Sequence, residues 1–176
     1  MKKIYVAALT VLLISFGSLA FALSDTAAHD VTMQVNEIAL IGLNNAGAIT
    51  LSTSDPGTPG EDPTGATNTT KILQYTSLVG SGVTRNITVQ WGGTDAAPAG
   101  TSLDLEAVSV PANCGTSGGL VTLSSAGQNL VTSIGSCATG IGANGTDLTY
   151  TFNIDTPSSL IVGDNQTVTI TFTLTD

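Results

Sequence analysis

Two segments near the end of the chain alternate apolar and polar residues with a period of two, and this pattern constrains the fold most. The apolar positions are Leu148, Tyr150, Phe152 and Ile154 in the first segment and Val168, Ile170, Phe172 and Leu174 in the second. Successive side chains of a β-strand point to opposite faces of its sheet. The alternation therefore predicts two strands, each with one buried and one wet face.

The rest of the chain favours the same class of structure. Its 28 threonines and 20 glycines disfavour helices and favour strands joined by turns. We expect about nine short antiparallel strands with turn signals between them, which indicates an all-β sandwich or barrel. One expected hairpin joins residues 72–79 to residues 84–91, and a further short strand is expected at residues 48–53.

The first 22 residues have the pattern of a secretory signal. Lys2 and Lys3 precede an apolar run, and Ala20-Phe21-Ala22 fits the small-residue cleavage rule. We expect residues 1–22 to be removed, residues 23–30 to form a flexible arm, and residues 31–176 to form one domain. The alternative is an uncleaved anchor helix, because the apolar run approaches the length of a membrane span. Cleavage predicts a secreted or cell-surface protein with no stable membrane span.

Charge excludes two classes of partner. After the signal, Lys71 and Arg85 are the only cationic side chains, against 13 acidic residues. Such a chain lacks the positive charge that nucleic acids and anionic lipid surfaces attract. The sequence therefore predicts neither nucleic-acid binding nor electrostatic attachment to a membrane.

Cys114 and Cys137 are the only cysteines, and export would bring them into an oxidising compartment. The intervening sequence contains two short β-like runs around Ser124–Gln128. If these runs form a hairpin, the two cysteines lie opposite each other, which predicts one disulfide. The alternative is a pair of buried free thiols.

Catalysis and cofactor binding have little support. His29 is the only histidine, so no Ser-His-Asp or Cys-His arrangement is available, and we expect no enzyme activity and no cofactor. A hydrolase that uses a carboxylate pair such as Asp104 and Glu106 is the remaining enzyme hypothesis. A solvated polar strand face explains that pair better.

The sequence contains candidate residues for calcium binding and for N-glycosylation. Oxygen ligands for calcium are available in an acidic Pro/Gly loop, at Asp55, Glu61 and Asp62, although a solvated loop explains them as well. We expect weak calcium binding there or none. The Asn-x-Ser/Thr triplets that would permit glycosylation in an exported protein begin at Asn68, Asn86, Asn144 and Asn165.

The first strand after the arm has an unusual pattern. Val31, Met33 and Val35 alternate with polar residues, so the apolar positions have odd numbers. At Glu37 the alternation shifts by one residue, and the next apolar positions, Ile38 and Leu40, have even numbers. One half of such a strand could pack into a groove of a neighbouring copy, while the other half pairs with the sheet of its own domain. The alternative is that residues 31–43 form only the first strand of their own domain.

The later part of the chain resembles a known group of proteins. GLVTLSSAGQNLVTSIGSCATG, LTYTFNI and TVTITFTLTD resemble small secreted bacterial proteins of uncertain function with an Ig-like, fimbrial-type β-sandwich. The resemblance covers roughly residues 31–176. More distantly, the layout is similar to TasA-type biofilm fibre subunits, archaeal bundling pilins and chaperone–usher pilins. These relationships imply subunits that lend a strand to the next copy.

Together these features predict an extracellular structural subunit of a surface filament, pilus or matrix fibre. We expect copies of the chain to assemble by donation of the strand that contains Val31, Met33, Val35, Ile38 and Leu40. The alternative is a monomeric secreted or surface-attached module that binds a glycan or calcium.

Overall fold

The computed structural model describes residues 26–93 and 95–175, so the predicted signal at residues 1–22 lies outside the described residues. The chain divides into two compact units, Met1–Gln34 and Val35–Asp176. In the first unit, residues 26–34 are exposed and contain no helix or strand. Among the described residues, no helix is long and apolar enough to span a membrane.

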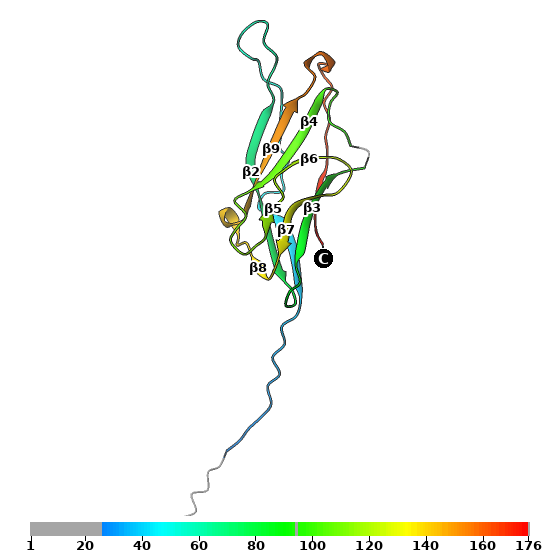
Figure 1. Ribbon diagram of the computed structural model, residues 1–176. Helices are drawn as coiled ribbons and strands as arrows, with labels where there is room; N and C mark the ends of the chain where they lie inside the picture. Colours follow the sequence, from blue (N-terminus) through cyan, green and yellow to red (C-terminus); the bar gives the residue numbers. More distant parts are fainter. Residues whose placement is uncertain (1–25, 94, 176) are drawn as a thin grey trace, which may run out of the picture. The chain divides into compact units, whose positions relative to one another are not determined.

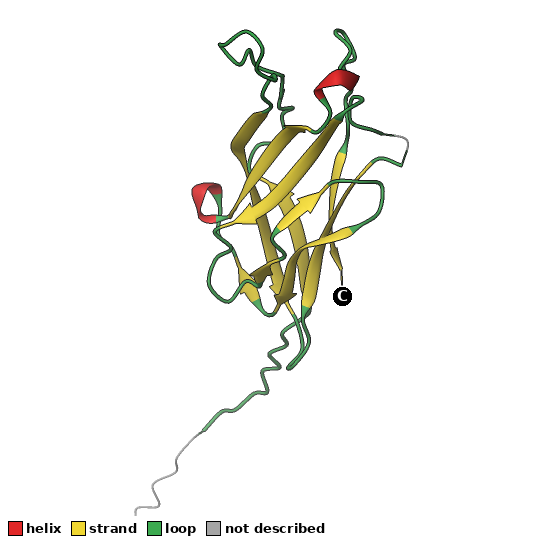
Figure 2. Cartoon of the chain, turned by 45° about the horizontal axis from the view of Figure 1, so that its top comes forward, coloured by secondary structure: helices red, strands yellow, loops and turns green. Residues whose placement is uncertain are grey.

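The second unit consists of two antiparallel sheets (Figure 1). The larger sheet has the order β1-β2-β9-β4-β6, with β8 also paired to β2, and the smaller sheet has the order β10-β3-β7-β5. The strands are β1 (Ile38–Leu43), β2 (Ala66–Leu78), β3 (Arg85–Trp91), β4 (Thr101–Val108), β5 (Thr116–Ser117), β6 (Leu120–Thr122), β7 (Gln128–Ile134), β8 (Cys137–Ala138), β9 (Thr146–Ile154) and β10 (Ile170–Thr175). Figure 2 shows these strands with two short 3-10 turns in the connecting loops, η1 (Gly142–Asn144) and η2 (Pro157–Ser159). The predicted all-β class is confirmed, with ten strands where about nine were expected.

The core lies between the two sheets and comes from alternate residues of each strand. The larger sheet contributes Leu73 and Tyr75 of β2, Leu103, Leu105 and Ala107 of β4, Val121 of β6, and Leu148 and Tyr150 of β9. The smaller sheet contributes Ile87 and Val89 of β3 together with Leu130, Val131 and Ile134 of β7. Of the four apolar positions that the alternation predicted for β9, Leu148 and Tyr150 lie in the core, whereas Phe152 and Ile154 are only half-buried.

Neither of the two expected hairpins forms, because the two arms of each belong to different sheets. Strand β2 pairs with β1, β8 and β9, whereas β3 pairs with β7 and β10 in the other sheet. Likewise β6 pairs with β4, whereas β7 pairs with β3 and β5. Both segments that looked like hairpins therefore cross from one sheet to the other. Residues 48–53 form no strand, although Ile49 and Leu51 pack against the core.

The predicted disulfide between Cys114 and Cys137 is confirmed, with 5.4 Å between the two Cα atoms. Cys137 begins β8 in the larger sheet, and Cys114 lies just before β5 of the smaller sheet. The bond therefore joins segments of different sheets rather than two arms of one hairpin. Gly115, with φ of 108°, follows directly, and an added Cβ there would lie 2.7 Å from the carbonyl oxygen of Thr132. Only glycine fits at this turn.

A buried tyrosine gives the fold an expected sensitivity to alkali. Burial raises the pKa of Tyr150 to about 12, from its ordinary value of 10.0. A raised folded-state pKa means that the contribution of this group to stability is complete below pH 10 and is lost as the pH rises towards 12. Between pH 8 and pH 11, we expect the free energy of unfolding to fall by roughly 1 kcal/mol more in wild type than in Tyr150→Phe. Urea denaturation of both proteins at the two pH values measures the difference, and equal losses would contradict it.

Candidate assembly surface

Five of the described strands have a single pairing partner, β1, β6 and β8 in the larger sheet and β5 and β10 in the smaller one, and they differ in how they are protected. Strand β8 is only two residues long. Strands β5 and β6 are only two and three residues long, so they offer few backbone groups to another chain. Strands β1 and β10 are six residues long and contain neither charged residues nor proline. Charge, proline and short length are the usual protections against edge-to-edge pairing. The side of the domain formed by β1 and β10 is therefore the one that is open to strand addition.

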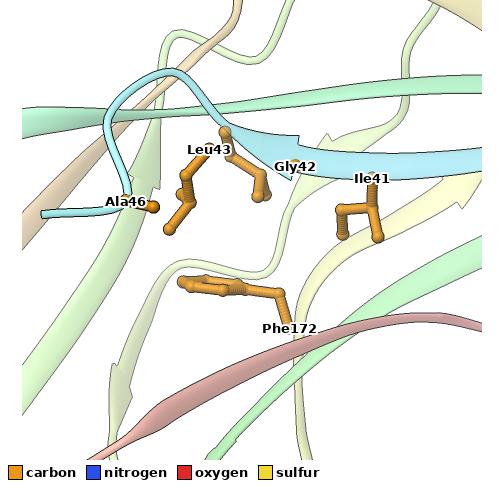
Figure 3. Close-up of a pocket in the computed structure, with 6 residues that line it drawn as sticks. Ile41, Gly42, Leu43, Ala46 and Phe172 are labelled. Atoms are coloured by element: carbon orange, nitrogen blue, oxygen red, sulfur yellow. The ribbon is translucent and has the colours of Figure 1, made fainter.

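An apolar hollow of about 210 Å³ lies between these two strands. Figure 3 shows the ring of Phe172, from β10, facing Leu43 and Ala46 across the gap, with Ile41 on the same side of β1. Phe172, Ile41 and Leu43 pack against the core but are only partly buried. By contrast, central residues such as Leu73, at the base of the hollow, are fully buried. The core is complete in the middle of the sandwich and incompletely covered on the β1–β10 side.

Strand β10 has one free edge. It pairs in register with β3, from Ile170 opposite Trp91 to Thr175 opposite Asn86. Among the described residues, no other segment exchanges backbone hydrogen bonds with β10. The backbone N–H and C=O groups on its far side are therefore available to a further strand, which would extend the smaller sheet.

The two buried cations hold both ends of β1 in its own domain. At the start, the guanidinium of Arg85 donates to the carbonyl oxygen of Ile38 at 2.7 Å and forms an ion pair with Glu37. Just beyond the end, the ammonium of Lys71 donates to the carbonyl oxygens of Asn45, at 2.9 Å, and Gly47. Arg85 and Lys71 are only 3% and 5% exposed. Because charge-assisted hydrogen bonds are strong when buried, β1 is a fixed edge.

This arrangement narrows the donor segment that the sequence indicated. Ile38 and Leu40 belong to β1, opposite Leu78 and Thr76 of β2, and their side chains lie on the outer face. The inward positions of β1 are Ile41 and Leu43, on the opposite phase. The second half of the slipped strand thus pairs with its own sheet, and only residues 31–36 remain as the candidate donor.

Residues 31–36 carry three exposed apolar side chains at every second position. Val31, Met33 and Val35 are 67%, 90% and 86% exposed, and the segment has no regular secondary structure. In an extended strand these three side chains would form one apolar face, which could pack on a partner surface.

The other predicted site residues do not form a common site. Asp55, Glu61 and Asp62 are exposed, and the Asp55 carboxylate accepts the N–H of Gly57. The described residues contain no group of three His, Cys, Asp or Glu side chains placed to hold a metal ion. His29 lies in the exposed segment before β1.

Of the two carboxylates on β4, Asp104 makes structural hydrogen bonds. The carboxylate of Asp104 accepts the hydroxyl of Thr122 at 2.6 Å and the amide of Asn153 at 2.7 Å. These bonds join β4 to its neighbours β6 and β9 on the outer face of the larger sheet. The expected polar strand face is thus solvated only in part, since Asp104 is buried and Glu106 is half-buried.

The four candidate glycosylation triplets differ in accessibility. The side-chain oxygen of Asn68 accepts from Thr70, and that of Asn86 accepts the N–H of Ser133. Asn144 is exposed, but Thr146 of its triplet is fully buried. All three residues of the Asn165 triplet are exposed, in the loop before β10. Asn165 is thus the most accessible of the four in the folded chain.

Comparisons with protein-family models, with curated proteins and with solved structures found no match for this chain. The candidate surface therefore rests on its own geometry: two unprotected edge strands, a hollow between them, and an exposed apolar segment.

Proposed function

We propose that the protein is an extracellular structural subunit of a surface filament, pilus or matrix fibre. In this proposal, residues 31–36 of one copy add a strand to the free edge of β10 in the next copy. Export is supported by the signal pattern of residues 1–22 and by the disulfide, which is typical of oxidising compartments. The observation that carries the proposal is the hollow between β1 and β10, at the edge of an otherwise complete core.

The donor and the acceptor match in length and chemistry. Six residues, 31–36, face the six residues of β10, and each segment spans about 20 Å when extended. Val31, Met33 and Val35 would face inwards, where Phe172 lines the hollow. Full burial of three such side chains contributes roughly 5–9 kcal/mol in total. Backbone hydrogen bonds to β10 would add to this value and help to offset the entropy of association.

Donation to another copy is favoured over closure within one copy. The carbonyl oxygen of Ile38 and the carboxylate of Glu37 are held by Arg85, which fixes the backbone directly after the donor segment. Closure within one copy would require residues 31–36 to fold back directly before this anchor. Head-to-tail donation between copies forms an open filament when the subunit rotation does not close a ring.

The test replaces the three apolar side chains of residues 31–36 that would face the core of the next copy, in the full chain. We expect Val31→Ser/Met33→Ser/Val35→Ser to reduce polymer formation at least about a hundredfold, because most of the apolar burial is lost. The monomer should keep its stability, since all three side chains are exposed in the free chain. Sedimentation and negative-stain microscopy measure the polymer, and urea denaturation measures the fold.

The matched control is Leu40→Ser, which removes an equally exposed apolar side chain from the outer face of β1 and should leave polymers intact. A peptide of residues 30–36 should also shorten wild-type polymers, whereas a scrambled peptide should not. Wild-type protein that stays monomeric at high concentration, without filaments on the cells that produce it, would contradict the proposal. That result would favour a monomeric glycan-binding or calcium-binding module.

A further inference from the structure

The outer faces of the two sheets differ in charge. The larger sheet carries two half-buried carboxylates on its outer side, Glu106 of β4 and Asp147 of β9, beside the buried Asp104. In the smaller sheet, Arg85 is the only charged residue in any of the four strands, and it is buried. The smaller sheet therefore presents an uncharged outer face on a strongly acidic protein.

This face is a regular array of hydroxyl and amide side chains. The strand register places Thr171 opposite Gln90, Thr173 opposite Thr88 and Thr175 opposite Asn86. Asn129 of β7 lies opposite Thr88 on the other side of β3. Apolar residues between these positions point into the core, so the array consists of the remaining, outward positions. We call it the Thr/Asn/Gln face.

We propose that copies of this protein associate laterally, with the Thr/Asn/Gln face of one copy against the same face of another. Among the described residues, Lys71 and Arg85 are the only Lys or Arg side chains, and both are buried. Contact through the acidic outer face of the larger sheet would therefore bring carboxylates together with no exposed lysine or arginine to offset them. The Thr/Asn/Gln face avoids this repulsion, and hydroxyl and amide groups both donate and accept hydrogen bonds.

The donor segment strengthens the inference, in a step that rests on the proposed function. When Val31, Met33 and Val35 face inwards, the residues between and after them face outwards, and these are Thr32, Gln34 and Asn36. A strand added at β10 would therefore widen the Thr/Asn/Gln face with the same three residue types. A single face is small for a stable interface. Repetition along a filament makes many weak contacts act together, so we expect filaments to associate side by side far more strongly than monomers.

The test introduces one negative charge on each outer face. Thr88→Asp changes an inner strand of the smaller sheet, and Thr76→Asp changes an inner strand of the larger sheet. Both threonines are half-buried and point outwards, and neither is in an edge strand. We expect Thr88→Asp to lower the fraction of bundled filaments at least tenfold, and Thr76→Asp to leave it unchanged. Filament width by electron microscopy and low-speed sedimentation are the readouts.

A second measurement separates this proposal from strand donation. In the Val31→Ser/Met33→Ser/Val35→Ser background, weak self-association of monomers at millimolar concentration should persist and should be lost on adding Thr88→Asp but not Thr76→Asp. Sedimentation equilibrium or NMR line widths can detect it. Equal effects of the two aspartates, or no self-association in either form, would overturn the proposal. Glycan binding that Thr88→Asp abolishes, without self-association, would assign the face to a glycan instead.

Discussion

Replacing Leu105 with alanine is expected to lower the free energy of unfolding by about 2–5 kcal/mol. Leu105 is fully buried in β4, opposite Tyr150 of β9 and Val121 of β6. Strand β4 is an inner strand of the larger sheet, and its neighbours on both sides limit how far the site can collapse around the cavity. Urea denaturation, monitored by circular dichroism, measures the loss.

Leu40→Ala is the matched control for this prediction. The same atoms are removed from β1 of the same sheet, but Leu40 is 64% exposed on the outer face. A change within about 0.5 kcal/mol is expected for such a surface position. Equal losses for the two variants would mean that the inward and outward phases of the larger sheet are assigned incorrectly.

The strands themselves could be predicted from the sequence because their signal is local. The alternation of residues 148–154 directly reports which side chains of β9 face the core. The partner of each strand could not be predicted in the same way. The segments at residues 72–79 and 84–91 are close in sequence and each has a β pattern, yet one belongs to each sheet. A sandwich needs such crossings to bury both inner faces, and nothing in the local pattern distinguishes a crossing from a hairpin.

The candidate site was predictable only in part, for a related reason. Val31, Met33 and Val35 were visible as an alternating segment, and the slip at Glu37 coincides with the point just before β1. The roles of Lys71 and Arg85 were not visible, because most of their hydrogen-bond acceptors are backbone carbonyl oxygens, which every residue carries. The one available signal was their rarity, since they are the only Lys or Arg residues after Lys3. The hollow at Phe172 depends on two edge strands that are more than 120 residues apart in the sequence.

The Cys114–Cys137 disulfide was predicted correctly, although the hairpin from which it was predicted does not form. The expected hairpin does not exist, yet the two cysteines meet because Cys114 and Cys137 approach each other from different sheets. The prediction relied on that hairpin, together with an exported chain that has only two cysteines. The bond therefore fixes the relation between two sheets at one point, which a hairpin crosslink would not do.

Removing this bond is expected to cost about 3 kcal/mol, because it closes a chain segment with a sequence separation of 23 residues. The double variant Cys114→Ala/Cys137→Ala should melt about 6–12 °C below wild type. Reduced wild type is the control for packing, since its thiols fill nearly the same volume without the crosslink. Cys114 is almost fully buried, so the alanine variant should be less stable than reduced wild type.

The position of the bond predicts where its loss acts. Cys137 lies opposite Ser77 of β2, and Ser77 lies opposite Ala39 of β1. Hydrogen exchange should therefore accelerate first in the two-residue strand β8, which has few other contacts, and spread to β1 only if β2 also loosens. Because Arg85 and Lys71 still hold the ends of β1, we expect reduced protein to retain the β1–β10 hollow and to polymerise as wild type does below its lowered melting temperature. Reduced protein that remains folded but no longer polymerises would show that the disulfide, and not the two buried cations, maintains the acceptor side.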